Sequence, residues 1–337
     1  MQWRTLMVEF YYLCMLYRNV FCIKIILNTN NPKMKKLLLL VAVALGLNAA
    51  AQQVKVVSIQ QVKVNQPVYH PEFMPDGNLL VTSESYDGLG IVNVKTRSYT
   101  SLTTMQGAGY YPAVSEDGKT IVTRSMNNKD FTQNLYKIDV ATKQVSPIVQ
   151  KIEHVNQIKL EKGELTYAVG GKAIKARLKN ISIPASRITT YVTEENLKIV
   201  VYRGNIRTIL DPLAGQFGDW DAQYCWTSLS PDGKKILFTC RNNSYTCDLN
   251  GKNVVKLGNI RAPKWCGNGY IVGMNDKSDG HTFTKSDILI VKSNGTGLQQ
   301  LTTSSSDIKM FPSASADGNK IAYHTLDGKI FVMTISK

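Results

Sequence analysis

The sequence predicts an all-β protein, a β-propeller of four-stranded antiparallel blades. Two observations carry this prediction. A short motif with an Asp-Gly turn between two hydrophobic segments recurs along the chain at intervals of about 40 residues, the length of one propeller blade. In addition, no stretch outside residues 34–51 keeps the 3.6-residue hydrophobic period of an amphipathic helix over three turns.

The repeated motif is clearest in four segments. They read PEFMPDGNLLVTS from Pro71, PAVSEDGKTIVTR from Pro112, TSLSPDGKKILFT from Thr227 and PSASADGNKIAYH from Pro312. Glycine supplies the positive φ of a tight turn, and the Asp carboxylate can accept a hydrogen bond from the backbone N–H two residues later. The following residues are rich in Val, Ile, Leu and Phe, as strands prefer. The motif therefore predicts a hairpin corner within a blade.

Three weaker units set the number of blades. Their turns lie at Lys162-Gly163, Glu195-Asn196 and Asn268-Gly269, which makes seven units in all. We expect seven blades, with six as the alternative if the weak units within residues 155–212 form a single blade. The last unit has room for only three strands, so we expect residues 54–59 to supply its fourth strand and close the ring.

The N-terminal region carries a secretion signal. The segment MKKLLLLVAVALGLNAAAQ from Met34 has a basic start, an apolar stretch and small residues before a cleavage site near Ala51. We expect residues 1–33 to be a mis-annotated extension ahead of the true start, residues 34–51 to be a cleaved signal peptide, and residues 52–337 to form one propeller domain. The mature protein would then be periplasmic or secreted by a bacterium, without an integral membrane segment.

The charge does not indicate a nucleic-acid partner. The formal charge is +15, but no run of five Lys or Arg residues occurs. Four cysteines remain after residue 51, and none shows the paired spacing of a zinc site. Cys240 and Cys247 flank a predicted hairpin loop, so a cross-strand disulfide is one possibility in an oxidising compartment, and buried free thiols are the other.

The repeat resembles that of the TolB-like β-propellers. The best matching segments are SLSPDGKKILF (Ser228 to Phe238), SASADGNKIAY (Ser313 to Tyr323) and AVSEDGKTIV (Ala113 to Val122). The resemblance implies the fold, and it covers periplasmic partners of envelope complexes, carbohydrate-related surface proteins and regulatory domains of peptidases. The chain departs from TolB, because too few residues follow Gln52 for an α/β domain ahead of the first blade. It departs from the peptidases because it contains no G-x-S-x-G motif.

Several aromatic residues stand near the start of predicted innermost strands. In propellers these positions lie at one mouth of the central channel. The residues are therefore predicted to ring a shallow pocket that stacks on sugars or grips a peptide, and packing between blades is the alternative. They are Tyr110, Tyr111, Trp220, Tyr224, Trp226 and Phe311.

Metal and catalytic candidates are few. Asp276, Asp279 and His281 gather in the most polar loop and are the metal candidates, although Lys277 breaks the calcium-loop pattern; the alternative is a long solvated hairpin. The motif aspartates lie in different blades and cannot converge on one substrate. No catalytic residue and no cofactor is predicted.

These observations favour a non-catalytic binding or scaffold propeller that recognises a protein, a peptide or a glycan of the cell envelope. The alternative is a propeller hydrolase or lyase that acts on glycans or peptides at the channel mouth. That alternative requires acidic or His residues to converge at the mouth.

Overall fold

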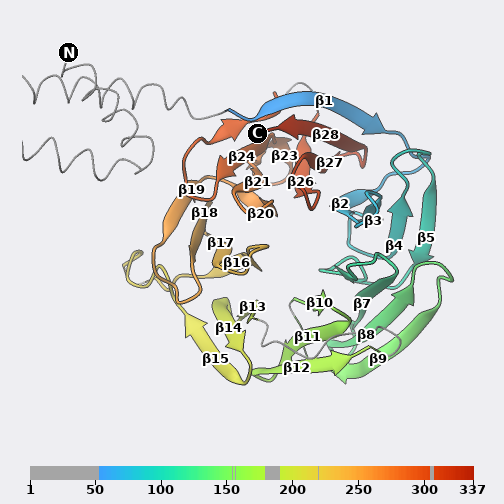
Figure 1. The fold of residues 1–337 in the computed structure, drawn as a ribbon, viewed down its shortest axis with the longest axis horizontal. Coiled ribbons are helices and arrows are strands. Elements are labelled where there is room, and N and C mark those ends of the chain that lie inside the picture. Colours follow the sequence, from blue (N-terminus) through green and yellow to red (C-terminus); the bar gives the residue numbers. More distant parts are fainter. Residues whose placement is uncertain (1–52, 154, 156, 179–189, 219, 304–306) are drawn as a thin grey trace, which may run out of the picture. The chain divides into compact units, whose positions relative to one another are not determined.

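The computed structural model describes residues 53–337 except residues 154, 156, 179–189, 219 and 304–306. Within this part, seven antiparallel sheets form a ring around a central channel, and no helix is present (Figure 1). The protein is therefore a seven-bladed β-propeller, as predicted. No helix in the described part is long and apolar enough to cross a bilayer. The predicted extension and signal peptide, residues 1–33 and 34–51, lie outside the described residues.

Five blades have four strands. Blade 1 contains β2 (Tyr69–Phe73), β3 (Leu79–Thr82), β4 (Leu89–Val92) and β5 (Tyr99–Thr103). Blade 2 contains β6 (Ala113–Val114), β7 (Thr120–Asn127), β8 (Thr132–Asp139) and β9 (Val145–Ile152). Blade 5 contains β16 (Tyr224–Leu229), β17 (Lys235–Cys240), β18 (Asn243–Asp248) and β19 (Val255–Gly258). Blade 6 contains β20 (Arg261–Cys266), β21 (Tyr270–Met274), β24 (Ile288–Lys292) and β25 (Gln299–Gln300). Blade 7 contains β26 (Lys309–Ala314), β27 (Lys320–Thr325), β28 (Ile330–Ser336) and β1 (Lys55–Val62).

Two blades have three strands among the described residues, where the sequence predicted four. Blade 3 contains β10 (Lys159–Glu161), β11 (Glu164–Val169) and β12 (Lys172–Arg177), and blade 4 contains β13 (Thr190–Glu195), β14 (Lys198–Arg203) and β15 (Ile206–Leu210). They are separate sheets, which settles the count at seven blades. A further hairpin, β22 (Lys277–Ser278) with β23 (Phe283–Lys285), projects from blade 6.

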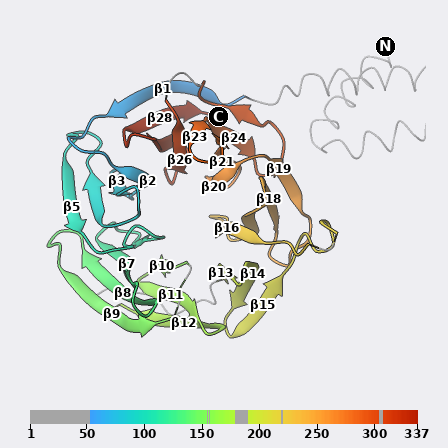
Figure 2. The same ribbon diagram turned by 180° about the vertical axis from the view of Figure 1, so that it is seen from behind.

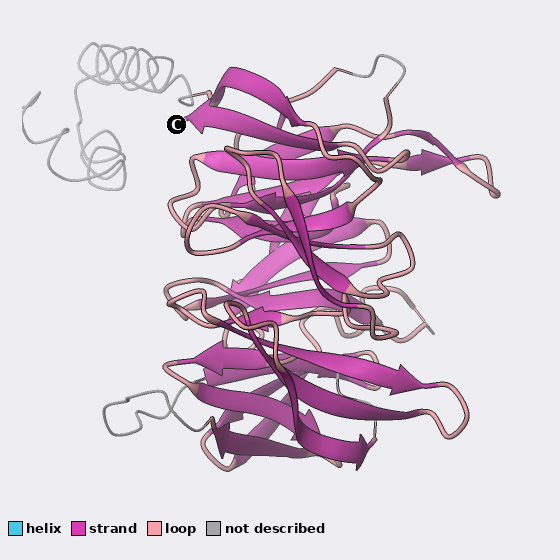
Figure 3. Cartoon of the chain, turned by 90° about the vertical axis from the view of Figure 1, so that its right-hand side faces the viewer, coloured by secondary structure: helices cyan, strands magenta, loops and turns pink. Residues whose placement is uncertain are grey.

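The chain closes the ring by pairing its first described strand with its last. Strand β1 runs antiparallel to β28, from the Lys55–Ser336 pair to the Val62–Ile330 pair. The same arrangement is seen from behind in Figure 2, and Figure 3 shows the ring edge-on. The predicted fourth strand of the last blade is confirmed, and it removes two open sheet edges.

The Asp-Gly motif forms the predicted hairpin corner. In blade 5, Gly233 has a φ of 70° and Asp232 accepts a hydrogen bond from the Lys234 N–H at 3.2 Å. The Ser230 hydroxyl donates to the Asp232 carboxylate at 2.7 Å and accepts from the Lys235 N–H at 2.9 Å. The Asp bond to the N–H two residues on recurs at Asp76, Asp117 and Asp317. In the sixth blade, Gly267 rather than Gly269 carries the positive φ of the corner.

Each blade packs on the next through its own apolar cluster. Phe238 and Ile236 of blade 5, for example, pack with Ile199 and Val201 of blade 4, and all four side chains are buried. Comparable clusters join the other six pairs of neighbouring blades. The core is therefore a ring of seven interfaces, and this ring holds the innermost strands at fixed positions around the channel.

The four cysteines of the propeller are all free thiols. Cys240 stands opposite Asn243 in the β17–β18 ladder, and Cys247 stands opposite Ile236. The two residues thus occupy opposite ends of the hairpin. This register excludes the cross-strand disulfide in this fold.

We expect the Ser230→Ala substitution to lower the free energy of unfolding by about 1–3 kcal/mol, because it leaves the partly buried Lys235 N–H without its acceptor and removes the hydroxyl that fixes the Asp232 carboxylate. Urea denaturation of the chain from residue 52 onward measures the change. Ser101→Ala, at an exposed position of β5, is the matched control and should change stability by less than about 0.5 kcal/mol. Equal effects of the two substitutions would contradict this role of the Ser hydroxyl.

Candidate functional site

β-Bulges interrupt the innermost strands of four blades. The ladder register shifts between Tyr69 and Glu72 in β2, and the same shift occurs in β16, β20 and β26. One residue within each shift has a positive φ, and Tyr111, just ahead of β6, has one as well. These bulge residues are His70 (51°), Tyr111 (46°), Trp226 (52°), Ala262 (45°) and Phe311 (46°). A bulge re-aims a side chain, and here it turns four aromatic rings from different blades toward the channel.

The bulge has a local sequence signature. Proline follows the bulge residue in four of the five blades, at Pro71, Pro112, Pro263 and Pro312. Proline has no backbone N–H, so each of these strands lacks a donor beside its bulge. A left-handed backbone costs a non-glycine residue roughly 1–2 kcal/mol, so five such residues at equivalent places mark a feature that the rest of the ring must stabilise.

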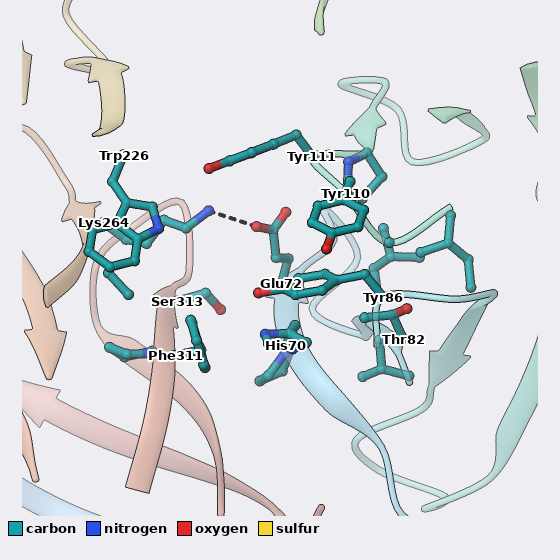
Figure 4. Close-up of a pocket in the computed structure, with 18 residues that line it drawn as sticks. His70, Glu72, Thr82, Tyr86, Tyr110, Tyr111, Trp226, Lys264, Phe311 and Ser313 are labelled. Carbon is teal, nitrogen blue, oxygen red and sulfur yellow. Dashed lines mark hydrogen bonds and ion pairs between the residues drawn. The ribbon is translucent and has the colours of Figure 1, made fainter. Parts of the chain in front are cut away.

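The bulge residues surround a cavity of about 220 Å³ in the channel, which we call the channel pocket (Figure 4). Its walls come from blades 1, 2, 5, 6 and 7. The side chains that matter most for its chemistry are His70, Glu72, Tyr86, Tyr110, Tyr111, Trp226, Lys264, Phe311 and Ser313. The pocket is therefore mainly aromatic, with a few polar groups among the rings.

A column of stacked rings forms one wall of the channel pocket. The Tyr110 and Tyr86 ring centroids are 4.4 Å apart, and those of Tyr86 and His70 are 3.9 Å apart. The edge of His70 meets Phe311 at 4.6 Å, and Phe311 stacks on buried His324 at 5.6 Å. Such contacts add to the energy of area burial, so the wall holds its shape without a ligand.

An ion pair crosses the channel pocket. Lys264 Nζ of blade 6 lies 2.7 Å from Glu72 Oε1 of blade 1 (Figure 4), and blade 7 lies between these two blades in the ring. The two side chains are 42% and 38% exposed, so the pair contributes only about 0–1 kcal/mol to stability. A second cavity of about 160 Å³, lined also by Gln157, Thr227 and Ser228, shares both charged residues. The ion pair therefore separates two parts of one channel.

Burial sets the charge of the ring column. It lowers the pKa of His70 to about 3, with further lowering by the nearby His324 and Lys264, and it lowers the pKa of His324 to about 4. Burial also raises the pKa of Tyr86 and Tyr111. The side chains of His70, His324, Tyr86 and Tyr111 are consequently neutral at pH 7. Glu72 and Lys264 carry the formal charges of the pocket lining.

The structure brings together four of the six predicted aromatic residues. Tyr110, Tyr111, Trp226 and Phe311 all line the channel pocket. Trp220 is 76% exposed and lies outside it. Tyr224 is buried between blades 4 and 5, where its hydroxyl donates to Asp211 and accepts from the Leu213 N–H.

The three metal candidates occupy different environments. Asp276 is buried, and its Oδ1 lies 3.5 Å from Arg261 Nε. Asp279 lies at the tip of the exposed β22–β23 hairpin, where it accepts hydrogen bonds from the N–H groups of His281 and Thr282 at 2.9 and 2.8 Å. Among the described residues, no three His, Cys, Asp or Glu side chains cluster closely enough to hold a metal ion.

Sequence reasoning missed five residues of the pocket, namely His70, Glu72, Tyr86, Lys264 and Ser313. A signal for most of them exists. The residue before each repeated proline is the bulge residue. In blades 1, 5, 6 and 7, the residue two positions after the bulge residue lines one of the two channel cavities, whereas Ala113 of blade 2 packs between blades 2 and 3. This rule identifies His70, Glu72, Lys264 and Ser313, but not Tyr86, which lies in the loop between β3 and β4.

Comparisons with known proteins show the fold alone. No protein-family model and no curated protein sequence matches the chain. A β-propeller domain of Cps50 (Swd1) from Myceliophteria thermophila matches with 10% identity and a TM-score of 0.54 over 84% of this chain and all of that one. A chain of a mitotic checkpoint complex matches with 10% identity and a TM-score of 0.53 over 86% of this chain and 94% of that one.

TolB from Acinetobacter baumannii is also similar, with 17% identity and a TM-score of 0.47 over 74% of this chain. The match spans 58% of the TolB chain. An oligogalacturonate lyase from Vibrio parahaemolyticus matches with 10% identity and a TM-score of 0.44, over 82% of this chain and 80% of that one. At such identities, the activities of these proteins do not transfer to this chain.

We expect the propeller to lose stability as the pH falls from 7 to 5. An unfolded His binds a proton near pH 6.5, whereas folded His324 does so only near pH 4, so the unfolded state binds more protons between these values. Each unit of pH in this window costs up to about 1.4 kcal/mol per such His. Urea denaturation at pH 7 and pH 5 should give a smaller difference for His324→Phe than for the wild type.

The exposed His281 supplies the control for this measurement. His281→Ala should keep the pH dependence of the wild type, because His281 is exposed on the β22–β23 hairpin and belongs to none of the buried clusters between blades. An unchanged pH dependence in His324→Phe would contradict the neutral, buried state of His324.

Proposed function

We propose that this protein is a non-catalytic binding propeller of the bacterial cell envelope, and that its channel pocket holds part of a partner protein, a peptide or a glycan. The proposal rests mainly on one observation, which is that the bulge residues of five blades surround the same cavity. Blades 1, 2, 5, 6 and 7 each place a positive-φ residue around one cavity, and four of these five residues are aromatic. Strained backbone that recurs around a single cavity supports a binding role.

The chemistry of the channel pocket favours binding over catalysis. Among the described residues that line it, Glu72 is the only carboxylate, and Lys264 neutralises it at 2.7 Å. His70 is half-buried and stacked on Tyr86, and its low pKa makes it a poor general base at pH 7. Hydrolysis or elimination at this place would need a second acid or base close to Glu72.

The envelope location rests on the signal-like segment at residues 34–51. The mature chain from Gln52 keeps 34 basic against 24 acidic residues, a balance that attracts anionic envelope components over long range. The propeller itself would supply the specific contacts through the channel pocket.

We expect the immobilised mature protein to retain a component of an envelope extract, and the Tyr111→Ala/Trp226→Ala double variant to retain at least tenfold less. Each substitution removes a ring from the pocket wall, and aromatic side chains dominate contact energies at binding sites. Quantitative mass spectrometry and sugar analysis of the eluates measure the retained material.

Trp220→Ala is the matched control, because it removes an exposed aromatic residue outside the channel pocket. It should retain as much as the wild type. Retention that survives the double variant, or no specific retention by the wild type, would contradict the proposed function.

A further inference from the structure

We infer that the ligand of the channel pocket is the end of a neutral saccharide chain, with one sugar ring held among the tyrosine hydroxyls and the Glu72–Lys264 pair; this inference rests on the proposed function. The argument uses the hydrogen-bonding groups that face the cavity, the charge balance of the pocket, the chemistry of the strand edges and the size of the cavity.

Three phenol hydroxyls point into the channel pocket. They belong to Tyr86, Tyr110 and Tyr111, and Figure 4 shows these three side chains around the Glu72 carboxylate, with Tyr111 reaching toward Lys264. No described residue forms a hydrogen bond with any of these hydroxyls. A phenol hydroxyl both donates and accepts, which suits a ligand whose groups do the same. Sugar hydroxyls have this property, and their C–H faces pack on aromatic rings.

The Glu72–Lys264 pair indicates a ligand without charge. A cationic ligand on Glu72 would release Lys264, and an anionic ligand on Lys264 would release Glu72; either leaves one charge without its partner. Two neighbouring hydroxyls avoid this cost, because one can donate to the carboxylate while the other accepts from the ammonium group. The charges are 2.7 Å apart and partly exposed, so they are accessible to a diol.

Two hydroxyl groups in the lining of the channel cavities have buried oxygens without a hydrogen-bond partner among the described residues. Ser313 is 6% exposed and lines the channel pocket, and its Oγ has no hydrogen-bond partner among the described residues. Ser228 Oγ, on the second cavity beyond the ion pair, is also buried without a hydrogen-bond partner among the described residues. Unpaired buried hydroxyls are costly, and polar ligand groups would satisfy them.

The strand edges argue against a peptide held by its backbone. Peptides that bind to sheet edges pair their main chain with free N–H and C=O groups of the edge strand. Here a bulge breaks β2, β20 and β26, and a proline removes a backbone N–H at Pro71, Pro263 and Pro312 in these strands and at Pro112 just ahead of β6. Recognition must therefore rely on side chains, and those present offer hydroxyls and ring faces.

The cavity size points to the end of a chain. A volume of about 220 Å³ lies below the ~300–1,000 Å³ of most small-molecule sites, which limits the pocket to a single ring. The second cavity of about 160 Å³ offers room for part of a neighbouring unit. A terminal sugar with a partly inserted second unit would fill both.

The test compares three portions of one envelope extract on the immobilised mature protein. One portion is untreated, one is digested with protease, and one is oxidised with periodate, which cleaves vicinal diols. Protease digestion should leave the channel-dependent retention intact, and periodate should reduce it at least tenfold. A panel of neutral methyl glycosides should compete with the retained material.

Point variants locate the contact. Lys264→Met should weaken retention at least tenfold, because it removes the donor and leaves Glu72 unpaired. Tyr111→Phe should weaken it two- to tenfold through loss of one hydroxyl. Lys329→Met is the matched control, since Lys329 forms a similar 2.7 Å pair with Asp327 away from the pocket. That variant should retain as much as the wild type.

The outcomes distinguish a failure of the saccharide inference from a failure of the proposed binding function. Retention that needs Tyr111 and Trp226 but is destroyed by protease and spared by periodate would overturn the saccharide inference and leave the binding function standing, with a peptide as ligand. Retention by a glycan that only charged sugars displace would also overturn it. Retention that does not depend on Tyr111 and Trp226 would overturn the proposed function itself.

Discussion

The bulge in the innermost strand is the constraint on which the site depends. In a regular strand, alternate side chains point into the two neighbouring blade interfaces, and none is free to face the channel. A single residue with positive φ breaks this alternation and turns its side chain inward, as Trp226 and Phe311 show. Phe311 also meets the His70 ring edge-to-face and stacks on His324, so its strained backbone and the aromatic wall stabilise each other.

This arrangement requires a rigid ring. The channel pocket takes walls from five blades, and the Glu72–Lys264 pair joins blades 1 and 6, which are not neighbours. Their positions are set by the seven apolar interfaces and by the β1–β28 ladder, which together leave no free end in the ring. A small relative shift of the blades would separate charges that now lie 2.7 Å apart. The interactions that stabilise the fold therefore also fix the geometry of the channel pocket.

Local chemistry made the fold and part of the site predictable. The Asp-Gly corners and their spacing predicted the blades and their number, and the strand expected at residues 54–59 does close the ring. These features were predictable because each depends on a short segment of sequence. Tyr110, Tyr111, Trp226 and Phe311 were predicted from their place before an inner strand. Tyr224 has nearly the same place, but it lies before the bulge, so its ring enters the blade interface. Glu72 and Lys264 are 192 residues apart, and only the closed ring brings them together.

One measurement tests whether a partner occupies the channel pocket. The chain from residue 52 onward, labelled with 5-fluorotryptophan, gives three fluorine resonances, from Trp220, Trp226 and Trp265. Trp226 lines the pocket, whereas Trp220 is exposed elsewhere and Trp265 packs between blades 5 and 6. Titration with the retained envelope component should shift or broaden the Trp226 resonance and leave the other two in place. A shift confined to Trp220 or Trp265, with Trp226 unchanged at saturation, would contradict the account.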